Sequence, residues 1–435
     1  MERILTSAVK SNLGKGVMLE GWLHAVRDLG SVCFLILRDR GGLAQVVLTD
    51  GNEVAKLNNL YTGTIIEVRG IAMANEKSRI GFEIQDAKIE ILKPVKYPSP
   101  VDISKSELHV EQDTLFDERV ITLRHPSQSA IFRVAAIVEK NMRKYFDNNE
   151  FVQINSPKII AFPTEGGSEV FEVQYFDRKV YLAQSPQFYK QIMVGVFERV
   201  YEIGRAYRAE KSNTSRHVSE ILMLDAEMGF IDSFEDIINF LQDFVIDVIN
   251  ATWAEAEVIL TELKAEKPLI PNRFPRISVK DLHELVKKEI GKDFTAERDV
   301  SPEEERFICE YSKKNWNSDF VYVLEFPWSD AKFYHHQNRQ NSEVTDRGDL
   351  LFRGIEITTL TQREVEYEKL IQQIKDKKFD PEHPGLKNYL DAFKYGMPDE
   401  GGFGFGIGRF VSKIIGLNNV KEAELFPRDV QRVTP

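Results

Sequence analysis

Two segments far apart in the chain, 205–217 and 401–409, carry the side chains best suited to hold a nucleoside triphosphate. The first supplies two guanidinium groups, a carboxylate and an imidazole, on Arg208, Arg216, Glu210 and His217. The planar guanidinium of arginine pairs with phosphate oxygens through two parallel hydrogen bonds. On a strand, Arg208 and Glu210 would share one face, where the carboxylate can accept from an adenine amino group and the arginine can bind the α-phosphate. Taken alone, this segment is equally typical of a charged surface hairpin.

The second segment alternates glycine with phenylalanine from Gly402 to Gly406. It lacks the strand–turn–helix spacing of a dinucleotide-binding G-x-G-x-x-G motif. In a strand, alternate glycines leave one face as bare backbone, so a flat base could lie on it while Phe403 and Phe405 pack into the core. Arg409 would then begin a helix, next to the base or the outer phosphate. A glycine-rich turn that closes a barrel is the competing hypothesis.

Two carboxylates accompany a predicted strand at 350–357, with Asp349 before it and Glu356 near its end. Carboxylate and phosphate oxygens together are typical ligands of Mg²⁺, and Glu356 is the better candidate of the two. Arg363 follows this strand and could bind the carboxylate of a second substrate. Each of these residues could also be an ordinary charge at the exposed end of a strand.

A glycine-containing loop at 164–169 and the helix that should open after residue 184 suggest a pocket for a small polar substrate. Ser185 is expected to cap this helix, with Pro186 at its first position. Gln187 and Lys190 then share one helix face. An amide beside an ammonium group suits an acidic amino-acid side chain, whereas a capped surface helix is the alternative.

The N-terminal part, 1–100, predicts a small closed β-barrel of the OB type. Short runs rich in β-branched and aromatic residues, separated by glycine-containing turns, lie at 17–23, 32–38, 43–48 and 65–71. Five or so strands in a stretch of this length are typical of such barrels. The proline-rich exit from the barrel indicates a linker, which we place at 101–115.

The remainder, 116–435, predicts an α+β catalytic domain built on a largely antiparallel sheet flanked by helices. Apolar spacing and polar caps predict a helix, a strand and a second helix, at 129–148, 151–154 and about 232–253. Strands alternate with helices in the final third. We expect a mixed, partly helical insertion around 255–318.

Length and composition limit the classes of protein. The 435 residues suffice for two or three domains. The net charge of −11 argues against a general nucleic-acid coat protein, but residues 1–100 carry 13 basic and 11 acidic side chains, which permits a selective contact with a polyanion. We expect no secretory signal and no membrane span. The only two cysteines, Cys33 and Cys309, predict neither a disulfide framework nor a thiolate metal site, so a cytoplasmic location is expected.

These segments resemble the signature motifs of class IIb aminoacyl-tRNA synthetases, and the likeness is closest to the archaeal-type aspartyl-tRNA synthetases. The helix and strand before Pro157 resemble motif 1, a dimer-interface element. Residues 207–217 resemble motif 2, and 402–409 resemble motif 3. Asp-Ala-Glu-Met at 225–228 also fits the pattern. The resemblance covers essentially the whole chain.

The resemblance implies activation of aspartate by ATP with Mg²⁺, followed by transfer from aspartyl-adenylate to the 3′ end of tRNA(Asp), in a homodimer formed through motif 1. Arg208 and Arg409 are the implied catalytic arginines, which position the substrates and neutralise charge. The implied ATP contacts are Arg208, Glu210, Arg216, His217, Glu356, Gly406 and Arg409. The implied Mg²⁺ ligands are Glu356 and Asp349. The implied amino-acid contacts are Glu165, Gln187, Lys190, Arg208, Thr359 and Arg363, with Lys190 and Arg363 facing the aspartate side chain.

The same resemblance makes the barrel the anticodon-binding domain. Phe34 would stack on an anticodon base and Gln45 would hydrogen-bond one, with Arg27 as a third candidate. His24 stands where relaxed enzymes of this family tend to carry histidine, which favours charging of tRNA(Asn) as well as tRNA(Asp). Arg79 favours strict tRNA(Asp) specificity, because specific enzymes tend to place a basic residue there.

Four departures from the family pattern lie in the active-site segments. Leu360 and Thr361 replace two glycines and are expected to add bulk beside the amino-acid pocket. Glu400 replaces a histidine, Gly408 replaces the acid before the motif 3 arginine, and a proline is missing before Phe333. An asparagine–tRNA ligase, a ligase for another amino acid, and a paralogue with a non-translational acceptor therefore stand as alternatives to an aspartate–tRNA ligase.

Overall fold

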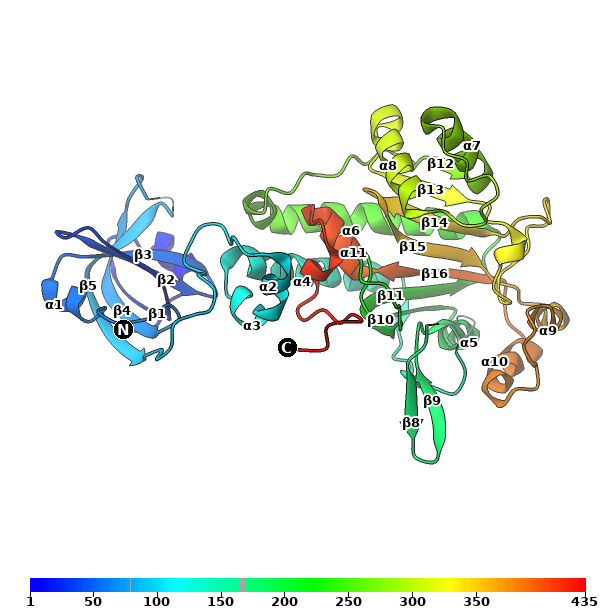
Figure 1. Ribbon diagram of the computed structural model, residues 1–435, viewed down its shortest axis with the longest axis horizontal. Helices are drawn as coiled ribbons and strands as arrows, with labels where there is room; N and C mark the ends of the chain where they lie inside the picture. Colours follow the sequence, from blue (N-terminus) through cyan, green and yellow to red (C-terminus); the bar gives the residue numbers. More distant parts are fainter. Residues whose placement is uncertain (79, 164–168) are drawn as a thin grey trace. The chain divides into compact units, whose positions relative to one another are not determined.

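The computed structural model describes residues 1–78, 80–163 and 169–435. The chain divides into two compact units, Met1–Ala130 with Pro435, and Ile131–Thr434 (Figure 1). Each unit has its own hydrophobic core. Within the described residues, no helix is long and apolar enough to cross a membrane.

The first unit holds a closed five-stranded barrel in the order β1-β2-β3-β5-β4, which confirms the predicted OB-type fold. The strands are β1 (Gly16–Asp28), β2 (Cys33–Asp39), β3 (Gly42–Leu48), β4 (Ile65–Ala74) and β5 (Phe82–Lys93). Alternate residues of β2, from Cys33 to Asp39, are buried, so the intervening side chains face outward. Short helical segments complete this unit: η1 (Thr6–Asn12), α1 (Gly51–Ala55), α2 (Gln112–Asp117) and α3 (Arg119–Thr122).

The second unit is built on an eight-stranded sheet in the order β12-β13-β14-β15-β16-β11-β10-β6. The strands are β6 (Val152–Gln153), β10 (Arg199–Tyr207), β11 (Glu220–Gly229), β12 (Arg276–Ser278), β13 (Phe320–Leu324), β14 (Arg347–Phe352), β15 (Ile355–Gln362) and β16 (Glu400–Gly406). Neighbouring strands run antiparallel except at the two edges, where β6 and β12 are parallel to their partners. The prediction of a largely antiparallel sheet is therefore confirmed.

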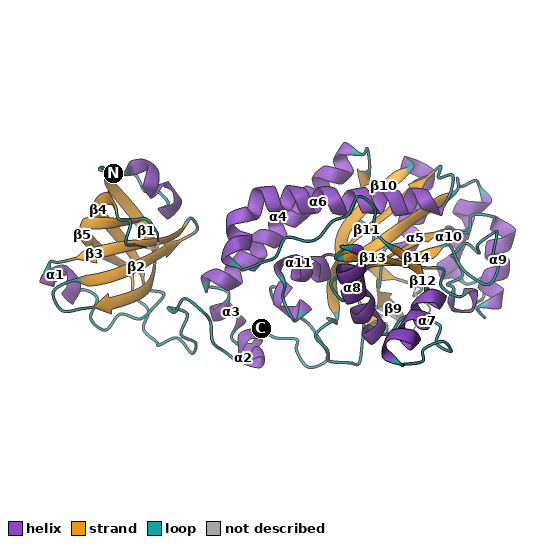
Figure 2. Cartoon of the chain, turned by 90° about the horizontal axis from the view of Figure 1, so that it is seen from above, coloured by secondary structure: helices purple, strands orange, loops and turns teal. Residues whose placement is uncertain are grey.

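Two long helices, α4 (Pro126–Asn148) and α6 (Phe234–Glu262), lie side by side against one face of this sheet (Figures 1 and 2). The ring of Phe244 on α6 contacts Phe403 and Phe405 of β16, with ring centroids 6.1 and 5.5 Å away. Helix α11 (Ile407–Ile415) follows β16 directly and packs into the same core. Of the β16 glycines, Gly404 and Gly406 line a cavity on the sheet, whereas Gly402 is covered by Glu227 and the backbone of β11.

Smaller elements surround the open face. Helices α5 (Gln187–Phe197), α9 (Tyr367–Asp376) and α10 (Pro384–Lys394) share a second apolar cluster. Helices α7 (Val279–Ile290) and α8 (Pro302–Trp316) pack on the β12–β13 edge in a third. A separate three-stranded sheet is formed by β7 (Ile159–Ile160), β8 (Glu172–Tyr175) and β9 (Arg178–Leu182). Two short turns, η2 (Trp328–Asp330) and η3 (Val420–Ala423), complete the unit.

Three predicted boundaries differ from the structure. Helix α6 begins as predicted after Ser233, which forms a capping box with Asp236, but it continues to Glu262 because its apolar face stays buried beyond residue 253. Helix α5 begins at Gln187, with Pro186 as its N-cap, one residue later than predicted. The predicted strand at 151–154 shortens to β6, a two-residue parallel edge.

Candidate active site

The open face of the large sheet holds a cavity of about 420 Å³. Residues from α5, β11, β14, β15, β16 and α11 line it, together with Arg208, which follows β10, so segments more than two hundred residues apart in sequence meet here. The sequence-predicted residues on its wall are Gln187, Lys190, Arg208, Glu356, Thr359, Arg363, Gly406 and Arg409. A larger cavity of about 660 Å³ shares only Arg216 with the predicted set, so its size does not mark it as the site.

The glycines of β16 allow carboxylates of β11 to lie over the strand. In the register of the two strands, Asp225 is opposite Gly404 and Glu227 is opposite Gly402. A Cβ atom on Gly402 would lie 2.0 Å from the carbonyl oxygen of Ala226 and 2.4 Å from Oε2 of Glu227. Glycine is therefore required at position 402 by close packing against β11, and not, as predicted, by a base lying on the strand at that position.

The cations at the inner end of the cavity are already paired. Lys190 Nζ lies 3.0 Å from Oδ1 of Asp225 and 3.3 Å from Oε2 of Glu227. Arg363 binds Glu227 with two hydrogen bonds, 2.6 Å from Nε and 3.1 Å from Nη2. All four side chains are buried, so these two cations and two anions balance before any substrate binds.

Asp225 and Glu227 were recognised in the sequence only as part of a family pattern. Their spacing of two residues was the available signal, because on a strand it places both carboxylates on one face. Their partners, Lys190 and Arg363, come from other elements and could not be paired with them by spacing. The Glu227 carboxylate, which lies beside the Arg363 guanidinium, raises the pKa of that arginine despite its burial.

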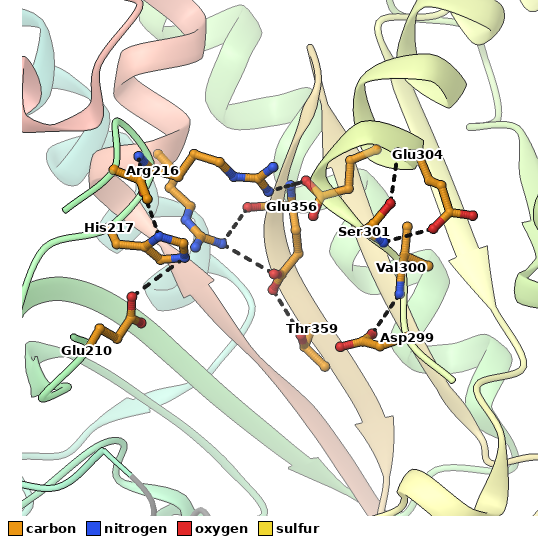
Figure 3. Close-up of polar contacts among 12 residues, drawn as sticks. Glu210, Arg216, His217, Asp299, Val300, Ser301, Glu304, Glu356 and Thr359 are labelled. Carbon is orange, nitrogen blue, oxygen red and sulfur yellow. Dashed lines mark hydrogen bonds and ion pairs between the residues drawn. The ribbon is translucent and has the colours of Figure 1, made fainter. Parts of the chain in front are cut away.

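Arg208 and Glu210 do not share one face of a strand, as was predicted, because β10 ends at Tyr207. Arg208 lines the cavity, whereas Glu210 turns away and its Oε2 lies 3.6 Å from Nε2 of His217 (Figure 3). The guanidinium of Arg208 has no hydrogen bond or ion pair with any residue in the described part of the chain. It is thus available for an anionic ligand.

The other two arginines are held by carboxylates. Arg409 Nη1 donates to the backbone oxygen of Glu356 at 2.9 Å and lies 3.3 Å from its Oε2. Arg216 pairs with Glu305 of α8. Each pairing fixes a long side chain without neutralising Arg208; Arg409 lines the cavity of about 420 Å³, whereas Arg216 lines neighbouring cavities.

His217 is a neutral hydrogen-bonding group that lines a smaller cavity together with Arg216 and Arg409. Its Nδ1 lies 2.7 Å from Oγ1 of Thr214. Burial, with the positive charges of Arg409 and Arg216, lowers the pKa of His217 to about 4. The imidazole therefore remains uncharged at neutral pH and can contact a phosphate or ribose oxygen only as a neutral donor or acceptor.

Asp349 and Glu356 face a smaller cavity of about 160 Å³ that Arg216, His217 and Arg409 also line. Oδ1 of Asp349 is buried without a hydrogen-bond partner among the described residues. Burial and the charge of Glu356 raise the pKa of Asp349 to about 7. No cluster of three or more metal-binding side chains occurs in the described residues, but Mg²⁺ commonly takes one or two carboxylates and completes its shell with water and phosphate oxygens. The pair therefore fits Mg²⁺.

Leu360 does not crowd the cavity. It pairs with Phe403 across β15 and β16, is fully buried and belongs to the core on the α6 face. Thr361 is opposite Gly402 and lines the cavity, so of these two replacements only the threonine adds bulk there. The alternation of side chains along β15 separates the two positions.

Gly408 stands where the family pattern has an acid, and the carboxylate of Glu424 lies in the space that the side chain of such an acid would enter. A Cβ atom on Gly408 would lie 2.7 Å from Oε1 of Glu424. Glu424 is buried, and its Oε2 lies 3.4 Å from Nη1 of Arg205. A carboxylate from the C-terminal segment thus occupies the space beside the first turn of α11.

On the barrel, Phe34 and Gln45 lie on outward-facing positions of the neighbouring strands β2 and β3, and Arg27 is paired with Phe34 across β1 and β2. Glu83 of β5, which the sequence reasoning missed, receives hydrogen bonds from Asn75, Gln85 and Gln45 at 2.5, 2.7 and 3.2 Å. The barrel surface therefore carries an aromatic ring and amides, and the Glu83 carboxylate that binds these amides is itself buried.

His24 does not join this surface. Its side chain is buried, and burial with the charge of Arg38 lowers its pKa to about 4. A direct contact between its ring and a base is not supported. Two other predicted residues, Glu165 and Arg79, lie outside the described residues.

The chain belongs to the class II tRNA synthetases for D, K and N, whose family model matches residues 111–430. Residues 17–92 match the family of OB-fold nucleic acid binding domains of the anticodon type. The chain is 41% identical to the aspartate–tRNA(Asp/Asn) ligase of Thermus thermophilus, over 100% of both chains. It is 37% identical to the aspartate–tRNA(Asp) ligase of Pyrococcus furiosus, over 97% of each. Among solved structures, asparaginyl-tRNA synthetase from Pyrococcus horikoshii with asparaginyl-adenylate matches with a TM-score of 0.91 and 26% identity, over 100% of both chains.

Proposed function

We propose that this chain activates aspartate with ATP and transfers it to the 3′ end of tRNA(Asp), and that it also charges tRNA(Asn). The full-length identity of 41% to a ligase named for both tRNAs carries this proposal. Lys190 and Arg363 line the cavity wall and are already paired with Asp225 and Glu227, so this wall supports a polar amino-acid side chain rather than an apolar one.

In the proposed reaction, Arg208 binds the α-phosphate of ATP and the carboxylate of aspartate together. One oxygen of that carboxylate forms a bond to the α-phosphorus as the bond to pyrophosphate breaks. The ribose 3′-hydroxyl of the tRNA then attacks the carbonyl carbon, and AMP leaves. No side chain has to act as a nucleophile, so the residues contribute by positioning and by neutralising charge.

We assign the outer phosphates to Arg216, Arg409 and His217, and the adenine to Glu210 and the face beside Gly406. The amino acid would be held by Gln187, Lys190, Thr359, Arg363 and Glu165. Glu356 and Asp349 would hold Mg²⁺. When bound, this ion would neutralise phosphate charge.

We propose that the barrel binds the anticodon through Phe34, Gln45 and Arg27, with stacking on the ring and hydrogen bonds from the amide. Base stacking on an aromatic side chain is worth about 1–3 kcal/mol. A half-buried Phe34 on an outward-facing strand position supports this role.

We further propose a homodimer formed through α4 and β6, in a cytoplasmic protein. Strand β6 lies at an edge of the large sheet and both of its residues are exposed, which suits pairing with a second copy. Both cysteines are free and buried, in keeping with a reducing compartment.

The deciding experiment is ATP–pyrophosphate exchange with each of the twenty amino acids, followed by charging of tRNA(Asp) and tRNA(Asn) transcripts. We expect exchange with aspartate and charging of both transcripts. Exchange with asparagine instead would identify an asparagine–tRNA ligase. Aspartate-dependent exchange without charging of either transcript would point to another acceptor and reject the proposal. Light scattering of the purified protein tests the dimer.

A further inference from the structure

Glu400, the acid that replaces a family histidine, sits at the end of a hydrogen-bonded chain of side chains. It is the first residue of β16 and is fully buried. Its Oε1 accepts a hydrogen bond of 2.9 Å from Nε2 of Gln191 on α5. Its Oε2 is buried without a hydrogen-bond partner among the described residues.

The amide of Gln191 links Glu400 to Gln187, which lines the cavity. Because its NH₂ group donates to Glu400, its oxygen is turned the other way. That oxygen accepts from Nε2 of Gln187 at 2.9 Å and from the hydroxyl of Tyr389 at 3.2 Å. Gln191 and Tyr389 are both buried, so no water competes for these positions.

The chain of bonds determines which end of the Gln187 amide is free. Its nitrogen is used by Gln191, and its side chain makes no other hydrogen bond within the described part of the chain. Gln187 lines the cavity beside Lys190. An amide oxygen is therefore left as an acceptor near the substrate.

We propose that Glu400 is a positioning residue that acts through Gln191 to hold the Gln187 amide oxygen toward the ammonium group of the bound amino acid. This inference rests on the proposed function of the cavity. The ammonium group is the part of the substrate that needs an acceptor, because the cations Lys190, Arg208 and Arg363 suit carboxylates and phosphates.

Either ionisation state of Glu400 can serve this role, because Oε1 accepts in both. Burial and the nearby charge of Glu227 raise the pKa of Glu400, so the neutral form is favoured. A glutamine at position 400 has the same shape and an acceptor oxygen. Glu400→Gln should therefore preserve the chain of bonds, whereas Glu400→Leu should break it.

The test measures KM for aspartate, KM for ATP and kcat in ATP–pyrophosphate exchange with the full-length protein. We expect Glu400→Leu and Gln191→Leu each to raise KM for aspartate about tenfold, the effect of losing one well-placed hydrogen bond, with KM for ATP and kcat unchanged. Glu400→Gln should stay within about twofold of wild type. Tyr389→Phe is the matched control, since it removes a bond to the same oxygen but leaves the chain intact, and it should also stay within about twofold.

A double-variant comparison separates positioning from general damage. Gln187→Ala alone should raise KM for aspartate about tenfold, and adding Glu400→Leu to it should raise KM no further. The inference is overturned if the two effects multiply, if Glu400→Leu changes KM for both substrates equally, or if it changes neither. If Glu400→Leu does not fold, as judged by its melting curve, Gln191→Leu decides in the same way. Absence of aspartate-dependent exchange in the wild type would instead reject the proposed function.

Discussion

Gly408→Glu, which restores the acid that the family carries before the motif 3 arginine, should destabilise this chain unless Glu424 is removed as well. The first side-chain carbon at position 408 would already lie 2.7 Å from Oε1 of Glu424. Glu424 cannot move freely, because it is buried and its other oxygen contacts Arg205. The two carboxylates therefore compete for one space.

The loss of stability expected for Gly408→Glu comes mainly from steric overlap with Glu424 rather than from charge repulsion between the two carboxylates. Two like charges 4 Å apart would repel by about 4 kcal/mol at an effective dielectric constant of about 20. The pKa of Glu424 is raised to about 7 by its burial, so protonating it at pH 7.5 costs about 1 kcal/mol or less and relieves that repulsion. Overpacking costs about 1–3 kcal/mol, so we expect Gly408→Glu to lower the free energy of unfolding by about 2–4 kcal/mol.

The assay is denaturant unfolding of wild type, Gly408→Glu, Glu424→Ala and the double variant. The double variant should be more stable than the sum of the single effects by about 1.5 kcal/mol or more. Gly51→Glu is the control, because a Cβ there meets nothing within 4 Å, and it should change stability by less than about 0.5 kcal/mol. Additivity of the two single effects within about 0.5 kcal/mol would refute the argument that Glu424 fills the place of the family acid.

Three further predictions follow from named contacts. Because the fold raises the pKa of Glu424 from 4.5 to about 7, its contribution to stability is complete below pH 4.5 and is lost as the pH rises through 7. In denaturant unfolding, wild type should lose about 3 kcal/mol of stability between pH 4.5 and 8, and Glu424→Gln should not show this loss. Arg363→Glu should abolish aspartate-dependent exchange while ATP binding stays measurable by calorimetry, and unchanged exchange would remove Arg363 from the pocket. Phe34→Ala should lower kcat/KM for tRNA charging by roughly 5- to 150-fold and leave ATP–pyrophosphate exchange unchanged, whereas an equal loss in both reactions would contradict anticodon stacking.

Local patterns in the sequence were sufficient to predict the barrel, the antiparallel sheet and the glycine face of β16. Each depends on a repeat of two or about 3.6 residues, which shows in neighbouring positions. The alternation of glycine with phenylalanine excludes a dinucleotide motif and predicts that Phe403 and Phe405 lie in the core. The structure confirms both core positions. The motif arginines were also identifiable, because their residue types and spacing limit the chemistry they can perform.

Only the tertiary structure decided which charges meet. Glu227 binds Arg363 across 136 positions of the chain, and Gln191 reaches Glu400 across 209. The ends of elements were decided in the same way: β10 stops at Tyr207 and α6 continues to Glu262, since tertiary packing sets both limits. The spacing of residues in the sequence predicts which side chains share a face. The partner of a buried charge, however, depends on which distant element packs against that face. The sequence by itself therefore determined the fold and the arginine set, and the fold decided the charge balance of the pocket.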